Sequence, residues 1–104
     1  MKRIVLLCNG GLSTGILVKK MKAAAEAQDF ACEISAAPVS DAEAVGAEAD
    51  LILLGPQVKY RYGEIVEKYG DKGIPIQVID QTDYGMMNGE KVLKSAIKLM
   101  KAAK

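Results

Sequence analysis

The sequence predicts an α/β protein with an open, four-stranded parallel sheet and helices on both faces. Short apolar segments alternate along the chain with longer segments whose apolar residues recur every three or four positions. The first pattern is typical of strands buried on both faces of a parallel sheet, and the second of amphipathic helices. Because the two alternate from end to end, βαβ units are expected, and 104 residues suffice for a single domain over residues 1–104.

The first part of the chain is expected to hold two strands and two helices. Residues 3–7 are an almost wholly apolar strand, and residues 14–28 carry an apolar stripe at helical spacing. Residues 31–36 have the pattern of a second short strand. Ser40 is a suitable cap for a weak, alanine-rich helix over residues 41–47.

The next strand and helix are expected around a Gly-Pro turn. Residues 51–54 are a continuous apolar strand that Gly55-Pro56 stops. Residues 58–69 are predicted to be helical, and Gly70 ends that helix.

The last part of the chain adds a strand, a loop and a helix. Residues 74–79 have the pattern of a fourth strand, and Pro75 near its start favours a place at the sheet edge. Residues 80–85 are predicted to be a loop. Residues 89–103 carry the apolar spacing of a final helix with an outward row of lysines.

Composition excludes several functional classes. The formal net charge of +1 provides no basic surface for nucleic acid. No apolar run approaches the ~18–20 residues that span a bilayer, and the N-terminal apolar run is too short for a signal peptide, which predicts a cytoplasmic protein without direct membrane insertion. The chain has no histidine, which excludes histidine-based relays and metal sites. We expect no metal, no cofactor and a monomer.

Cys8 is the candidate catalytic residue, because it stands where the first strand meets a glycine-rich turn. The first N–H groups of a helix lack internal partners, and the helix dipole favours negative charge there, so anions and thiolates are stabilised. Successive N–H groups in such a turn also form a nest for oxyanions. The candidate phosphate-binding residues are Asn9, Gly10, Gly11, Leu12, Ser13, Thr14 and Gly15.

Two further segments should meet Cys8 at the carboxyl edge of the sheet, where ligands bind in this architecture. Residues 55–59 contain Gln57, which either hydrogen-bonds the cysteine turn or caps a helix. Residues 80–85 contain Asp83, either a turn residue or a functional acid, and Tyr84, which either lines the cleft or covers the edge of the core.

The second cysteine, Cys32, is expected to be a small apolar residue of the core. It begins the second strand, whereas Cys8 ends the first, so in parallel neighbours they lie at opposite ends of the sheet. At ~3.3 Å per residue they are roughly 15 Å apart, and a disulfide needs Cα atoms within about 7 Å.

The whole chain resembles enzyme IIB of the lactose/cellobiose class of the bacterial phosphoenolpyruvate-dependent sugar phosphotransferase system, which shares the topology of low-molecular-weight tyrosine phosphatases. The matching segments are Cys8-Asn9-Gly10-Gly11-Leu12-Ser13-Thr14, Leu53-Leu54-Gly55-Pro56-Gln57 with Tyr60, Val78-Ile79-Asp80, Tyr84-Gly85 and Asn88-Gly89.

The resemblance implies a phosphoryl carrier. Cys8 would accept a phosphoryl group from a phosphohistidine of the IIA protein and pass it to a sugar bound by the IIC membrane permease. The sugar would be cellobiose, chitobiose or another β-glucoside or lactose-type disaccharide. Because a carrier must dock two partners over one site, Cys8 is expected to be exposed.

Two other classes remain as alternatives. Low-molecular-weight tyrosine phosphatases place an arginine six positions after their cysteine, and here that position is Thr14. Asp83 favours this alternative, because those phosphatases carry a general-acid aspartate in a late loop. A thiol redox protein is disfavoured, because no second cysteine is expected near Cys8.

Overall fold

A computed structural model describes residues 2–8, 12–39, 49–70 and 73–102. Four parallel strands form one sheet in the order β2-β1-β3-β4. The strands are β1 (Lys2–Cys8), β2 (Cys32–Pro38), β3 (Leu51–Leu54) and β4 (Ile76–Val78). The helices are α1 (Leu12–Ala27), the 3-10 helix η3 (Pro56–Arg61), α3 (Tyr62–Tyr69), α4 (Gln81–Gly85) and α5 (Gly89–Ala102). The predicted fold class is confirmed.

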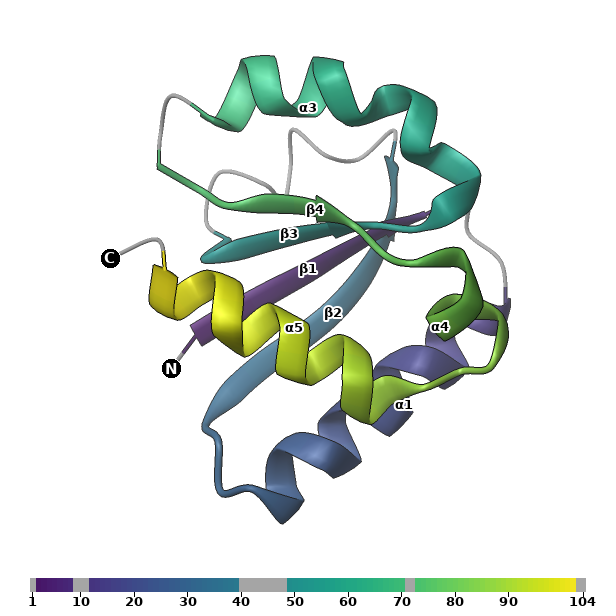
Figure 1. The fold of residues 1–104 in the computed structure, drawn as a ribbon, viewed down its shortest axis with the longest axis vertical. Coiled ribbons are helices and arrows are strands. Elements are labelled where there is room, and N and C mark those ends of the chain that lie inside the picture. Colours follow the sequence, from purple (N-terminus) through teal and green to yellow (C-terminus); the bar gives the residue numbers. More distant parts are fainter. Residues whose placement is uncertain (1, 9–11, 40–48, 71–72, 103–104) are drawn as a thin grey trace.

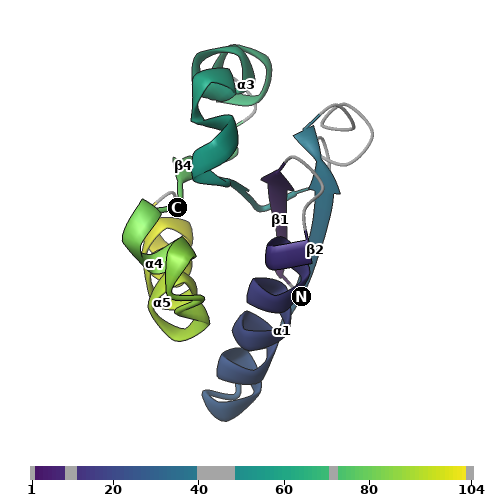
Figure 2. The same cartoon turned by 90° about the vertical axis from the view of Figure 1, so that its right-hand side faces the viewer.

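The sheet is the middle of three layers, with α3 on one face and α1 and α5 on the other (Figures 1 and 2). Successive residues of β1 point to opposite faces. Ile4 and Leu6 therefore pack in a core cluster with α1 and α5, while Val5 and Leu7 pack in a second cluster with η3 and α3. All four are 5% exposed or less, which explains why the strand is a continuous apolar run.

The register of β1 and β2 confirms that the two cysteines lie far apart. Cys32 pairs with Lys2, and Cys8 pairs with Pro38. At ~3.3 Å per residue the separation along the strands is roughly 20 Å. Neither cysteine forms a disulfide. Burial raises the pKa of the Cys32 thiol, as expected for a partly buried apolar role.

Helix α1 begins two residues before the predicted start. The predicted helix covered residues 14–28, whereas α1 starts at Leu12 and ends at Ala27. A Cβ at position 15 would have no heavy atom within 4 Å, so this glycine provides no close approach. The glycine-rich composition led to a prediction of too long a turn.

The segment predicted as one helix over residues 58–69 is two helices. Pro56 starts η3 as its first residue, and α3 follows at Tyr62. Val58 has the non-helical angles φ −116° and ψ 20°, and its side chain is fully buried against β1 and β3. The backbone departs from helical geometry at the residue that enters the core.

The predicted loop over residues 80–85 is wrong, because residues 81–85 form α4. Asp80 caps this helix: its Oδ1 accepts from the N–H of Thr82 at 2.7 Å and of Asp83 at 3.4 Å. Strand β4, Ile76–Val78, is shorter than the predicted 74–79 and occupies the sheet edge that Pro75 indicated.

The predicted helix over residues 41–47, with its cap Ser40, lies outside the described residues. Within the described ranges, no helix is both long and apolar enough to cross a membrane.

Candidate functional site

Cys8 ends β1 at the point where the order of the strands reverses. From β1 the chain passes through α1 to β2 on one side, and the later strands β3 and β4 lie on the other. The carboxyl ends of β1 and β3 therefore flank the switch point, which is where parallel α/β sheets bind ligands. Cys8 and Gly55, the residue after β3, occupy these two ends.

The Cys8 side chain is covered, contrary to the expectation of an exposed cysteine. Its residue is 3% exposed, and its Sγ lies 3.8 Å from the carbonyl oxygen of Ala37 on β2. An S–H group is a weak donor, so this contact orients the thiol more than it stabilises the fold.

Gly55 places Gln57 beside Cys8. Leu54 pairs with Leu7, and the N–H of Gly55 donates to the carbonyl of Leu7 at 2.9 Å, so Gly55 continues β3 next to Cys8. A Cβ at position 55 would lie 3.7 Å from the Cys8 Cβ and 2.7 Å from Oε1 of Gln57. The carboxamide of Gln57 thus occupies the space of the missing side chain.

The predicted phosphate-binding segment is described only in part. Asn9, Gly10 and Gly11 lie outside the described residues, and for Leu12, Ser13 and Thr14 only the backbone is described. These three residues and Gly15 form the first turn of α1. The first four N–H groups of an α-helix have no partner within it, so this turn presents donors immediately after the cysteine segment.

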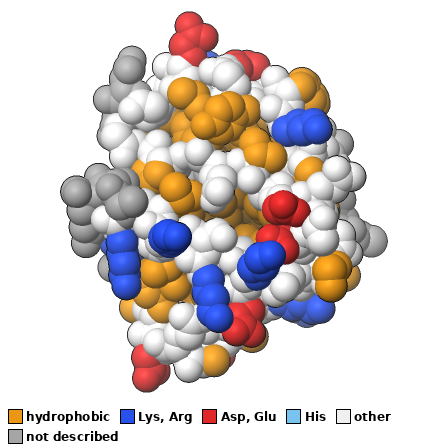
Figure 3. Space-filling view, viewed as in Figure 1, with side chains coloured by type: hydrophobic (Ala, Val, Ile, Leu, Met, Phe, Trp, Pro, Cys, Tyr) orange, Lys and Arg blue, Asp and Glu red, His pale blue; other side chains and the backbone are white. Residues whose placement is uncertain are grey.

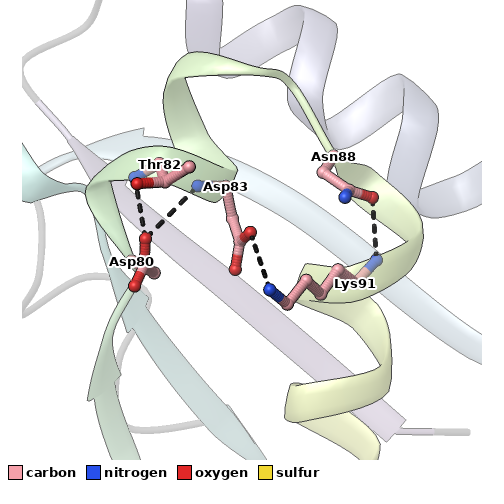
Figure 4. A network of polar contacts seen from close by, with 5 residues as sticks. All are labelled: Asp80, Thr82, Asp83, Asn88 and Lys91. Carbon is pink, nitrogen blue, oxygen red and sulfur yellow. Dashed lines mark hydrogen bonds and ion pairs between the residues drawn. The ribbon is translucent and has the colours of Figure 1, made fainter.

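Asp83 lies in a polar network on α4 and α5 (Figure 4). Its Oδ1 is 3.4 Å from Nζ of Lys91, and the side chain is 13% exposed. Asn88 caps α5, because its Oδ1 accepts from the Lys91 N–H at 3.2 Å. Asp80 and Asp83 also line a cavity of about 220 Å³ beside β4 and α5, and neither Cys8 nor Gln57 is among its described lining residues.

Tyr84 belongs to the core. It is 7% exposed and joins Leu17 and Val18 of α1 and Ile79 in the cluster beneath α1 and α5. Of its two predicted roles, covering the core edge is the one that this burial matches.

The exposed face of α5 is charged. On the face that Figure 3 shows, most Lys and Arg side chains lie in the half that contains α5, and the largest apolar cluster lies in the half that contains α3. Lys91 and Lys94 face Asp83 and Glu90 at 3.4 and 3.5 Å, as on a solvated helix face. Among the described ranges, no group of three potential ligand side chains could hold a metal ion.

A parallel sheet of four strands, with a cysteine at the end of the first strand and a helix directly after it, defines the class of low-molecular-weight phosphatase-like folds that includes the IIB domains. The family model for the lactose/cellobiose-specific IIB subunit of the PTS, the phosphotransferase system, matches residues 3–95. The chain belongs to this family and is a phosphotransferase component.

Sequence relatives agree with this assignment. The PTS galactose-specific EIIB component of Lactococcus lactis subsp. cremoris (strain MG1363) is 42% identical, with 95% of this chain and 96% of that protein covered. The cellobiose-specific EIIB component of L. lactis subsp. lactis (strain IL1403) shares the same identity and coverage. The oligo-beta-mannoside-specific EIIB component of Bacillus subtilis (strain 168) is 37% identical, with 96% and 97% covered.

Solved structures show the same architecture. The cellobiose-specific IIB component of Borrelia burgdorferi has a TM-score of 0.82 and 35% identity, over 99% of this chain and 94% of that chain. The lactose-specific IIB domain of Streptococcus pneumoniae has a TM-score of 0.85 over 94% and 96%. At 20% identity the latter supports the fold alone.

Proposed function

We propose that this IIB component carries a phosphoryl group on Cys8, from a phosphohistidine of a IIA protein to a sugar bound by a IIC permease. The observation that carries the proposal is the position of Cys8 in a family member: at the carboxyl end of β1, at the switch point of the sheet and just before α1. Both partners would be met in the cytoplasm.

The transfer would proceed in two displacements at phosphorus. The Cys8 thiolate attacks the phosphoryl group, an S–P bond forms, and the P–N bond breaks with its electron pair going to the histidine nitrogen of the donor. A sugar hydroxyl oxygen later attacks the same phosphorus, its proton leaves to solvent, and Cys8 departs as thiolate. Such transfers depend mainly on positioning and charge stabilisation, which the free N–H groups of the first turn of α1 are suited to supply.

A carrier fits these residues better than a hydrolase does. Thr14 stands at the position where the phosphatases need a bidentate arginine. The carboxylate of Asp83, the candidate general acid, is held by Lys91. Without this arginine, the loop stabilises the transition state of hydrolysis less. A phosphocysteine would therefore persist until a partner takes its phosphoryl group.

The sugar would be a cellobiose-, chitobiose- or lactose-type disaccharide. The relatives named above are specific for galactose, cellobiose and oligo-beta-mannoside. The galactose- and cellobiose-specific components are both 42% identical to this chain, so the degree of identity does not distinguish their sugars. Substrate choice would therefore belong to the permease.

The test supplies labelled phosphoenolpyruvate, the general phosphotransfer proteins and a IIA protein. The wild type and Cys32→Ser should take up one phosphoryl group with the acid–base stability of phosphocysteine, and Cys8→Ser none. Rapid turnover of p-nitrophenyl phosphate by the isolated protein would instead favour the phosphatase alternative.

A further inference from the structure

Gln57 presents a hydrogen-bonding carboxamide near the carboxyl end of β3. Gln57 is the second residue of η3, and its side chain is exposed. Within the part of the chain that the structure describes, no hydrogen bond engages this carboxamide. It nevertheless lies back over Gly55 instead of extending into solvent, since its Oε1 is 2.7 Å from the position of a Cβ at residue 55.

Position 55 needs glycine because a side chain would not fit there, and not because of its backbone conformation. Its angles of φ −64° and ψ 151° are open to any residue, so no left-handed geometry requires glycine here. Gly55 is buried, and a side chain on it would point into the site between Cys8 and Gln57, 3.7 Å from the Cys8 Cβ. The absent side chain is what lets the carboxamide lie beside the cysteine.

We propose that the Gln57 carboxamide donates a hydrogen bond to a phosphoryl oxygen on Cys8. The Cys8 Sγ now faces Ala37 on β2, so the side chain would turn about χ1 when it takes up the phosphoryl group. Gln57 would then act from the β3 side of the switch point, while the first turn of α1 provides N–H donors from the β1 side. Rotation about the last side-chain bond exchanges the amide oxygen and NH₂, which are similar in size, so the NH₂ can occupy the position where Oε1 now lies. The inference rests on the proposed phosphorylation of Cys8.

The test compares Gln57→Met, which keeps the length of the side chain and removes the donor, with Gln57→Glu, which adds a negative charge. Because Gln57 is exposed, both variants should fold like the wild type. Gln28→Met and Gln28→Glu are the matched controls, since Gln28 is exposed just beyond the far end of α1. Each protein is equilibrated with phosphorylated IIA protein, and the phosphorylated fraction is measured.

A hydrogen bond to a charged group predicts a shift of about tenfold toward phosphorylated IIA in Gln57→Met, a larger shift in Gln57→Glu and none in the Gln28 controls. Gly55→Ala should also shift the equilibrium toward phosphorylated IIA, because its Cβ would displace the Gln57 carboxamide. In the wild type, the side-chain amide NMR signals of Gln57 should move on phosphorylation, and those of Gln28 should not.

Wild-type equilibrium in Gln57→Met, together with unmoved Gln57 amide signals, would overturn this role while leaving phosphorylation of Cys8 intact. A wild-type protein that takes up no phosphoryl group on Cys8 would instead overturn the carrier function, and this role with it.

Discussion

Gly89, the first residue of α5, lies against the backbone of α1 at Lys20. A Cβ at position 89 would come within 2.6 Å of the Lys20 Cβ and 2.7 Å of the Lys20 carbonyl carbon. Backbone atoms cannot swing away as the end of a side chain can. Gly89→Ala should therefore separate the two helices and lower the free energy of unfolding by about 1–3 kcal/mol, the usual cost of overpacking. Urea denaturation measures this loss.

Gly63→Ala is the control for that substitution. Gly63 is in α3, and a Cβ there would meet no heavy atom within 4 Å. Alanine is favoured over glycine in helices by up to about 1 kcal/mol, so this variant should be as stable as the wild type or more so. Equal unfolding midpoints for the two variants would show that α1 and α5 do not approach so closely.

Asp80 should stabilise α4 through its side chain. Its Oδ1 accepts two N–H groups of the first turn, and a cap of this kind is worth about 1 kcal/mol. Asp80→Ala should lose that amount in chemical denaturation, and Asp80→Asn should retain most of it because asparagine caps helices equally well. A loss of equal size in both variants would point to the charge of Asp80 rather than to its cap.

Met87 ends α4 in a conformation that favours glycine. Its φ is 54°, its N–H donates to the Tyr84 carbonyl at 3.1 Å, and the N–H of Asn88 donates to the Asp83 carbonyl at 2.9 Å. This is the Schellman motif, with methionine in the left-handed position. Because Met87 also packs on the core, the informative pair is Met87→Gly and Met87→Ala. The glycine variant should be about 1 kcal/mol more stable, and the reverse order would exclude the left-handed conformation.

Cys32 should react with alkylating agents only at raised pH. Burial disfavours its thiolate and raises its pKa in the folded protein. The corresponding stabilisation is fully present below the pKa of the unfolded thiol and is lost as pH rises through the folded pKa. In Cys8→Ser, whose one remaining thiol is Cys32, the rate of iodoacetamide labelling should rise at higher pH in buffer than in denaturing urea. Coincident profiles would contradict the burial of this thiol.

Local patterns predicted that the four strands exist, but the bounds of β1, β2 and β4 differ by one or two residues from the prediction. Leu51–Leu54 has the predicted bounds, because a run of four large apolar residues ends at Gly55-Pro56 and admits no other strand. The sequence pattern did not predict the order of the strands, since that order depends on which apolar faces meet in space. Pro75 indicated only that β4 lies at an edge.

Helix α4 was missed because it depends on short-range hydrogen bonds that composition hides. Helix α4 is only five residues long, too short for a periodic pattern, and it depends on the cap that Asp80 supplies. The spacing of Asp80 and Asp83 could have indicated the start of a helix. Asp is a favoured N-cap residue, and a second acidic residue is favourable in the first turn.

The sequence predicted that Gln57 lies near Cys8, but not how the two residues pack. The rule that ligands bind at carboxyl ends of parallel strands correctly brought Gln57 near Cys8. The burial of Cys8 and the use of Gly55 as space for a carboxamide could not be predicted, because both arise from contacts between separate strands.

The passage of the phosphoryl group through Cys8 can be followed in a single chase. The protein is phosphorylated with label by a IIA protein, purified, and mixed with membrane vesicles that contain the cognate IIC permease and its sugar. The carrier function predicts that label on Cys8 is stable in buffer alone and moves to the sugar when vesicles are added, with no transfer through Cys8→Ser. Label that is released as inorganic phosphate at the same rate with and without vesicles, or that reaches the sugar through Cys8→Ser, would contradict it.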